Sequence, residues 1–451
     1  MALETTLIAK YSAYPEYKDS GVEWLDVIPC DWVVSKIKYL APFQVGWTPS
    51  TKVDANFIGD NLWANISDLR GKYLDHTAKN ISDEAAKAAS MEISPKGSLL
   101  YSFKLSVGSV SFASKDMYTN EAIASFLKGG SLPLSYMYYA LPKFVIENAS
   151  TNIYGARILN QELINNAYML APSYQEADKI SNFLDHETAK IDTLIDKQQQ
   201  LIKLLKEKRQ AVISHAVTRG LNPSAPMRDS GVECLGEVPE HWCEYPLKAL
   251  FSLKQGYAFD GANFSDKGEF ILMTPGNFNE RGGYKYKRPE KFYVGTDIPE
   301  GFILKGGQML VAMTEQTPGL LGCALFVPNE GTYLHNQRLG LVQNLRKDKV
   351  SVKYLFHFFN SSRYRAQVSV TSTGAKVKHT SSEKILTIKI CLPPVSEQED
   401  IANFVDETMN KIEVLEEKAA QIMLLLQERR TALISAAVTG KIDVRNWHAH
   451  K

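Results

Sequence analysis

Apolar residues recur at steps of three, four or seven along two long stretches of the chain. The positions are Leu184, Ile191, Leu194, Leu201, Leu205 and Val212 in the first stretch, and Val405, Ile412, Leu415, Ile422, Leu426 and Leu433 in the second. This spacing, held over several heptads, is typical of coiled-coil helices. Each seam predicts a helix of about 45 residues, which cannot bury its apolar side alone. We expect the two helices to pair antiparallel within the chain; the alternative is that each packs separately on its own domain.

Proline and glycine mark the ends of both predicted helices. Pro172 precedes the first helix, and the pair Pro393-Pro394 precedes the second. Gly220 follows the first helix and Gly440 follows the second. Proline does not continue a helix and glycine commonly ends one, so these residues set the expected boundaries.

Shorter apolar runs precede each predicted helix and indicate mixed domains. Residues 98–103, 108–114, 269–274 and 322–328 are rich in β-branched, aromatic and other apolar residues, which predicts strands. Two longer stretches with aromatic side chains, 131–144 and 353–368, predict helices. Aromatic residues at that spacing more often form the core than a functional site.

The chain repeats itself in one order. Residues 19–40 and 229–250 are identical at 10 of 22 positions, including Trp32 and its counterpart Trp242. The helical stretches 180–218 and 401–439 are identical at 19 of 39 positions. Two such matches in the same order indicate a tandem duplication of one unit, a domain followed by a long helix.

The middles of the two copies differ, although their frames match. Residues 41–170 and 251–390 share only a skeleton, such as Asn120 and its counterpart Asn336. A protein that recognises two unrelated sequences would need matching flanking segments around two different central segments. Two copies whose internal packing has diverged would show the same pattern.

These patterns predict an α+β protein with two mixed α/β domains in a pseudo-two-fold arrangement, separated by two long antiparallel coiled-coil helices. The expected bounds are 1–171 for the first mixed domain, 172–226 for the first long helix and linker, 227–394 for the second mixed domain, and 395–451 for the second long helix and the C-terminal tail.

The net charge of +1 does not by itself indicate a nucleic-acid binder. Its distribution is more informative, because residues 14–171 contain 14 Lys and Arg against 16 Asp and Glu, whereas residues 227–394 contain 21 against 16. The second mixed domain is therefore locally basic. A near-neutral DNA-binding protein must concentrate its positive charge on one face, or join partners that supply it.

The motifs of several enzyme classes are missing from the sequence. It contains no G-x-x-x-x-G-K-[ST] phosphate loop, no G-x-G-x-x-G and no Asn-Pro-Pro-aromatic tetrapeptide; Asn222-Pro223-Ser224 falls short of the last. The five cysteines form no C-x-x-C pair, which argues against a zinc site and fits a reducing cytoplasm. No apolar run is long enough to span a bilayer, and no export signal is visible. We expect a cytoplasmic chain without a catalytic centre or a metal site.

Two repeated motifs resemble a known family. Asp-Ser-Gly-Val-Glu-Trp-Leu at 19–25, with Ile28-Pro29 and Trp32, is repeated at 229–242 and resembles the start of each recognition domain in specificity subunits of type I restriction–modification enzymes. Residues 392–415 and 428–442 closely resemble the repeated helical region of that family. The likeness covers nearly the whole chain, in the family's order.

The resemblance implies that each mixed domain is a target recognition domain, which reads one half of a split sequence in double-stranded DNA. It implies that the helices set the separation of the half-sites and dock two methyltransferase subunits and restriction/translocase subunits. S-adenosylmethionine, ATP and Mg would then be bound by those partners, and none by this chain.

Polar and basic side chains near predicted loops are the candidates for DNA contact, because they can reach base edges or phosphates. They are Lys104, Lys115, Asn120 and Arg157 in the first domain, and Arg281, Lys285, Lys287, Arg288, Gln337, Arg338, Lys376 and Lys378 in the second. Two alternatives remain open: a coiled-coil scaffold without DNA readout, and a single-chain DNA modification enzyme. The first would lack salt-dependent DNA affinity, and the second would need a cofactor site.

Overall fold

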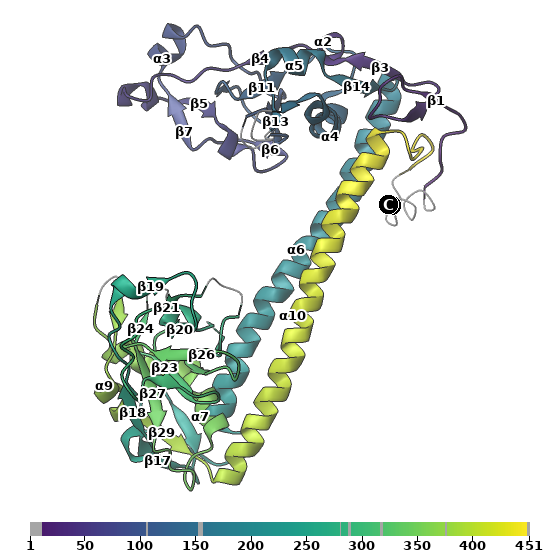
Figure 1. Cartoon of the computed structure of the whole chain (residues 1–451). Helices are drawn as coiled ribbons and strands as arrows, with labels where there is room; N and C mark the ends of the chain where they lie inside the picture. Colours follow the sequence, from purple (N-terminus) through teal and green to yellow (C-terminus); the bar gives the residue numbers. More distant parts are fainter. Residues whose placement is uncertain are drawn as a thin grey trace. The chain divides into compact units, whose positions relative to one another are not determined.

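The computed structural model describes residues 11–104, 107–151, 157–279, 281–286, 290–315, 319–374 and 377–448. The chain divides into two compact units (Figure 1). The first contains the residues up to Gln198 and those from Gln421 onward, and the second contains Gln199–Ala420. Each unit thus holds one mixed domain and a part of both long helices, α6 (Tyr174–Arg219) and α10 (Val395–Val438). None of the described helices is long and apolar enough to cross a membrane.

The first mixed domain is built on two small sheets. The larger sheet has the order β4 (Phe43–Val45), β11 (Ile123–Phe126), β8 (Leu99–Ser102), β9 (Val110–Ala113) and β6 (Tyr73–Leu74). The smaller has the order β10 (Tyr118–Thr119), β5 (Asn61–Ala64) and β7 (Lys79–Ile81). The domain also contains three strand pairs: β1 (Tyr17–Asp19) with β2 (Val27–Pro29), β3 (Val33–Lys36) with β14 (Tyr168–Ala171), and β12 (Ser150–Thr151) with β13 (Arg157–Ile158). Its helices are α2 (Ile37–Leu40), α3 (Asp83–Ala88), α4 (Leu134–Phe144) and α5 (Gln161–Asn166).

The second mixed domain also has two sheets. One has the order β18 (Ser252–Gln255), β27 (Leu339–Gln343), β23 (Met309–Ala312) and β25 (Ala324–Phe326). The other has the order β19 (Phe264–Ser265), β21 (Phe292–Tyr293), β20 (Phe270–Met273), β26 (Thr332–His335) and β22 (Ile303–Leu304). The strand pairs are β15 (Met227–Asp229) with β16 (Glu237–Pro239), β17 (Cys243–Pro246) with β29 (Lys389–Leu392), and β24 (Thr314–Glu315) with β28 (Lys378–His379); the helices are α7 (Val352–Phe359), α8 (Ser362–Thr371) and α9 (Ser382–Thr387).

The predicted strands and helices are found in the structure with one exception. The helix expected over 353–368 is divided into α7 and α8. The hydroxyl of Ser361 accepts a hydrogen bond from the backbone N–H of Tyr364 and so caps the start of α8. The Asn360 side chain is engaged by the backbone of Ala324 in β25. The cap at Ser361 and the two bonds between Asn360 and Ala324 compete with a continuous helix, so the prediction of one helix was wrong.

In each unit the ends of the mixed domain meet beside a long helix. In the first unit β3 pairs with β14, and in the second β17 pairs with β29, both antiparallel over four residues. The second strand of each pair leads into α6 or α10. These strand pairs close each mixed domain next to its long helix, and we call this place the domain root. The sheets of each domain are formed by the segments between the paired strands, which differ between the two copies.

A buried tryptophan connects each domain root to the start of its helix. The indole N–H of Trp32 donates to Glu176 at 3.0 Å in the first unit, and that of Trp242 donates to Glu397 at 3.2 Å in the second. Both glutamates lie in the first turn of their helix, where a negative charge is favoured by the helix dipole. A buried donor that loses its partner costs about 1–3 kcal/mol, so these bonds hold the start of each helix against its domain root.

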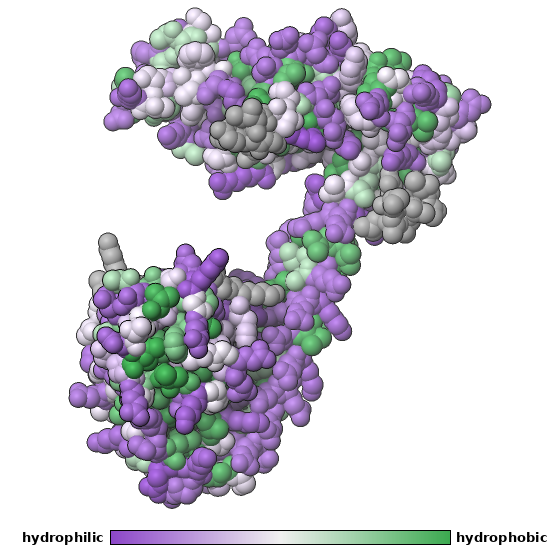
Figure 2. Space-filling view, viewed as in Figure 1, coloured by the Kyte–Doolittle hydropathy of each residue, from purple (hydrophilic) through white to green (hydrophobic). Residues whose placement is uncertain are grey.

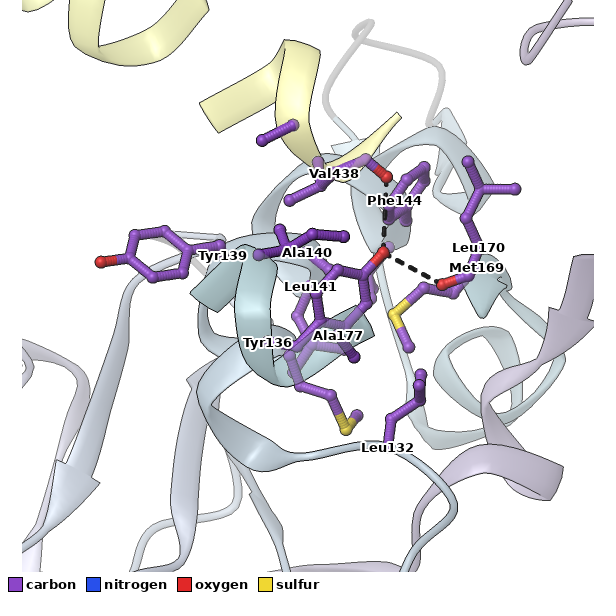
Figure 3. Close-up of a cluster of buried hydrophobic side chains, with 14 of the residues drawn as sticks. Leu132, Tyr136, Tyr139, Ala140, Leu141, Phe144, Met169, Leu170, Ala177 and Val438 are labelled. Carbon is purple, nitrogen blue, oxygen red and sulfur yellow. Dashed lines mark hydrogen bonds between the residues drawn. The ribbon is translucent and has the colours of Figure 1, made fainter. Parts of the chain in front are cut away.

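A buried tyrosine connects each domain to the end of the other long helix. In the first unit the Tyr136 hydroxyl on α4 contacts the carbonyl oxygens of Leu170 and Val438, so it reaches the end of α10 (Figure 3). In the second unit the Tyr354 hydroxyl on α7 donates to the Val217 carbonyl, near the end of α6, at 2.9 Å. Burial raises the pKa of both phenols above their ordinary value, so each stays a neutral donor.

The two long helices pack against one another within each unit, as the antiparallel pairing predicts. In the first unit Leu184 and Ile191 of α6 share a core cluster with Leu433 of α10. The Arg430 guanidinium there donates to Asp192 at 2.8 Å. In the second unit Ile213 and Val217 of α6 share a cluster with Val405 of α10.

The predicted seam is correct toward the helix ends and wrong toward the middle. Leu184, Ile191, Leu205, Val405, Ile412 and Leu433 are buried, Val212 and Leu426 are partly buried, and Leu194, Leu201, Leu415 and Ile422 are exposed. A straight helix has 3.6 residues per turn, so a strict 3.5-residue pattern drifts around it by about 20° in each heptad. Toward the helix ends the seam residues belong to the buried core clusters, whereas these four residues toward the middle are 40–48% exposed.

The glycine after α10 gives a prediction about the domain root. Gly440 has φ +72°, and a Cβ there would lie 2.4 Å from Cδ of Pro29. Gly21 has φ +71° with nothing within 4 Å. We expect Gly21→Ala to lower the free energy of unfolding by about 1–2 kcal/mol, through the left-handed backbone alone. Gly440→Ala adds a clash and should cost about 2–4 kcal/mol. Urea denaturation followed by circular dichroism measures both, and equal losses would contradict the contact.

Candidate nucleic-acid interface

An asparagine-headed turn stands at the same place in both mixed domains. It follows β10 in the first domain and β26 in the second. The Asn120 side-chain oxygen accepts the backbone N–H of Ala122 at 3.1 Å, and the Asn336 oxygen accepts that of Arg338 at 3.0 Å. The backbone carbonyl of each asparagine also accepts the N–H three residues further on. Asparagine is suited to such turns because its side chain bonds its own backbone two residues on.

A glycine brings a second segment against each turn. A Cβ on Gly46 would lie 1.8 Å from the carbonyl oxygen of Thr119, and one on Gly256 would lie 2.1 Å from that of Asn336. The next residue in each copy is aromatic, and its backbone N–H donates to the turn: Trp47 to Thr119, and Tyr257 to His335, both at 2.9 Å. Only glycine permits this approach, so the backbones of the two segments are fixed together.

A buried histidine closes the second turn. Nε2 of His335 lies 2.9 Å from the carbonyl oxygen of Leu339, which can only accept, so this nitrogen carries the proton. Burial lowers the pKa of His335 to about 4, and the ring is therefore neutral at neutral pH. The side chains of Gln337 and Arg338 at the tip are exposed.

The structure brings together two predicted groups that are distant in sequence. The Arg338 carbonyl accepts the backbone N–H of Met313, directly before β24. β24 pairs with β28, in which Lys378 lies opposite Glu315, and the Lys378 ammonium donates to Ser369 at 3.1 Å. Gln337, Arg338 and Lys378 therefore belong to neighbouring segments of one surface of the second domain.

Other predicted residues are engaged by the fold. The Arg281 guanidinium forms an ion pair with Glu416 of α10, and that of Arg157 donates to the carbonyl of Ile146 at 3.2 Å. The Asn120 amide oxygen holds its own turn, as described above. These three side chains have structural contacts that the sequence pattern did not predict.

The remaining predicted residues are exposed or lie outside the described parts of the chain. Lys104 follows β8, with its ammonium 5.9 Å from the centre of the Phe103 ring. Lys115 and Lys285 are exposed and lie outside the helices and strands. Lys287, Arg288 and Lys376 lie outside the described residues.

The sequence pattern missed the exposed aromatic residues Trp47 and Tyr257. Both follow a glycine at matching points of the two copies, 25 residues after Val22 and Val232 respectively, so an alignment of the copies would have found them. No group of three or more His, Cys, Asp or Glu side chains within the described ranges could hold a metal ion.

Comparison with known proteins gives two matches to one family model. The model describes the type I restriction modification DNA specificity domain, and it matches residues 29–204 and 239–424. The specificity subunit of the type I restriction enzyme MjaVIII of Methanocaldococcus jannaschii is 21% identical over 430 residues, which are 93% of this chain and 95% of that subunit.

Two solved structures share the fold. One is a chain of a type I R-M system, with a TM-score of 0.63 and 12% identity over 91% of this chain and 98% of that one. The other is the HsdS subunit from Thermoanaerobacter tengcongensis, with a TM-score of 0.53 and 12% identity over 92% of this chain and 98% of that one. At such identities they support the architecture alone.

The contact between Arg281 and Glu416 predicts a role in stability. Glu416 is buried on α10 and Arg281 is only partly exposed, so removing the guanidinium leaves a carboxylate in a poorly solvated place. We expect Arg281→Ala to lower the free energy of unfolding by about 1–3 kcal/mol, and Arg338→Ala, at an exposed tip, to change it by less than about 0.5 kcal/mol. A double-mutant cycle with Glu416→Gln isolates the pair; an Arg281→Ala loss of the same size in the Glu416→Gln background would contradict it.

Proposed function

Because this chain belongs to the family of type I restriction modification DNA specificity domains, of which it carries two copies, we propose that each mixed domain reads one half of a bipartite DNA target. The observation that carries this proposal is the duplication itself. The root strands, the Trp–Glu bond and the long helix repeat in both units, whereas the sheets between them have different strand orders and different surface residues. Two mixed domains that differ from one another, held by the same root and helix, are suited to a DNA target whose two halves differ.

The proposed partners are two methyltransferase subunits, together with restriction/translocase subunits. A repeated apolar surface on the long helices supports two equivalent docking sites. At an offset of 221 residues, Leu194 corresponds to Leu415, Leu201 to Ile422, and Leu204 to Leu425, and all six are exposed. The first unit contains Leu194, Ile422 and Leu425, and the second contains Leu415, Leu201 and Leu204.

Hydrophobic surface is visible along the two helices in Figure 2. Clustered exposed leucines are typical of surfaces that bind another protein. Because each unit carries one equivalent set of three, the chain offers the same surface twice. We also infer from their length that the helices set the gap between the half-sites.

We propose that the chain supplies no catalysis and holds no cofactor, so that S-adenosylmethionine, ATP and Mg are bound by its partners. The first unit has a cavity of about 730 Å³ lined by Lys72, Lys96 and Lys128 among others. Asp178 and Asp185 line the same cavity, and the Lys72 ammonium pairs with Asp185, so the charge of the lining is mixed and does not by itself distinguish a single-chain modification enzyme. Titrating the pure chain with S-adenosylmethionine distinguishes that alternative, since saturable binding would support it.

Exchange of the central segment of one mixed domain should change only one half of the DNA target. We expect a chain in which residues 251–390 come from another specificity subunit to direct methylation to a target with one new half and one parental half. The reason is that the bond between Trp242 and Glu397, which joins the domain to the start of α10, lies outside the exchanged segment. Sequencing of methylated adenines in cells that produce the complete modification complex reads out both halves. A change in both halves, or in neither, would contradict the assignment.

Single substitutions in the repeated apolar surface should remove one partner subunit at a time. We expect Leu194→Glu to weaken docking on the first unit and Leu415→Glu on the second, each by about 10- to 100-fold, since burying a leucine contributes about 1.5–3 kcal/mol. Native mass spectrometry of the complex should then show one methyltransferase subunit in place of two. Lys206→Glu on α6 serves as a control for the added charge, and loss of a subunit there too would argue against the surface.

A further inference from the structure

The two asparagine-headed turns present different side chains on one backbone frame. In the first domain the residue after Asn120 is Glu121, which is exposed, and the next, Ala122, is buried. In the second domain both following residues, Gln337 and Arg338, are exposed. The frame is constant because each turn has the same asparagine bond and the same glycine approach. Only the tips vary.

An exposed aromatic ring stands beside each tip. Trp47 is 57% exposed and Tyr257 is 42% exposed, and each is hydrogen-bonded through its backbone to the turn. An exposed ring next to a polar tip can contact a sugar or a thymine methyl group. The pairing of an exposed ring with an exposed polar tip occurs in both domains, although the residues differ.

The tip side chains are available to a ligand. The Gln337 amide and the Arg338 guanidinium form no hydrogen bond or ion pair within the part of the chain that the structure describes. In the first domain the Thr48 hydroxyl donates to the Glu121 carboxylate and orients it, while Ala258 stands at the corresponding place beside Tyr257. One carboxylate oxygen of Glu121 therefore remains free to accept.

From these observations we infer that the two turns are the base-reading elements, with Glu121 as the specificity-determining residue of the first half-site and Gln337 and Arg338 as those of the second. This inference rests on the proposed function. A carboxylate is repelled by phosphates, so at a DNA surface Glu121 can be favourable only toward a base amino group, above all N4 of cytosine. Arginine donates to O6 and N7 of guanine, and glutamine pairs with N6 and N7 of adenine.

The first half-site should therefore contain a base pair read through an amino group, and the second a guanine read by Arg338. Trp47 and Tyr257 flank these contacts and support them without selecting a base. Lys378, whose strand neighbours the Arg338 turn, then lies where it can contact the phosphate backbone.

The test uses the full chain in its modification complex, with a pool of targets in which each position of both half-sites carries every base. The relative methylation of each target gives the discrimination at each position. We expect Arg338→Ala to reduce discrimination at one base pair of the second half-site by about 10- to 100-fold, with the first half-site unchanged. Glu121→Gln should alter one position of the first half-site and none of the second.

Lys347→Ala is the matched control. Lys347 is exposed and follows the C-terminal end of β27, whereas the Arg338 turn precedes the N-terminal end of that strand. This substitution removes the same charge and should leave every position as in the parent. Unchanged discrimination in Arg338→Ala and Glu121→Gln would overturn the inference. A uniform loss of methylation across all targets would overturn it as well, because that is the signature of a phosphate contact. Failure of the parent chain to direct methylation to any bipartite target would instead overturn the proposed function.

Discussion

The buried bond between a tryptophan and the first-turn glutamate of a long helix is the constraint on which both units depend. In the first unit Trp32 bonds Glu176, and Gly440 at the end of α10 packs against the same indole. In the second unit Trp242 bonds Glu397, and Gly220 at the end of α6 packs against that indole. Each junction thus joins a domain root, the start of one helix and the end of the other. Because neither helix can bury its apolar side alone, the domains and helices stabilise each other.

This construction separates support from recognition. The root is determined by interactions that tolerate little change: a buried indole N–H, a phenol that donates to a helix carbonyl, and glycines that leave no space for a side chain. The asparagine-headed turns follow β10 and β26, where hydrogen bonds hold the backbone but the tips face solvent. Substitution at a tip therefore costs little stability and can alter what is bound, which is how one frame can carry two different readers.

The sequence predicted what depends on periodicity and repetition, and it missed what depends on tertiary contact. The long helices, the strands at 98–103 and 322–328 and the duplication follow from spacing and identity, and the structure has them. The heptad pattern predicted that Leu194 and Leu415 are buried, but both are exposed. A straight helix has 3.6 residues per turn, so a pattern with a period of 3.5 residues does not stay on one side of it, and the sequence does not show which positions lose their partner. Arg281 was predicted to contact DNA because the sequence does not reveal its ion pair with Glu416, which lies 135 positions away. Trp47 and Tyr257 follow a glycine at matching points of the two copies, but their exposure and their backbone bonds to the turns are visible only in the structure.

The central claim is that one chain carries two independent readers on a common support. Sequencing of all methylated adenines in a cell that carries the complete system tests it most directly, without any substitution. The account predicts a single target made of two short, unlike sequences separated by a gap of constant length in which any base is accepted. A continuous target, a perfect palindrome or a gap of variable length would contradict it.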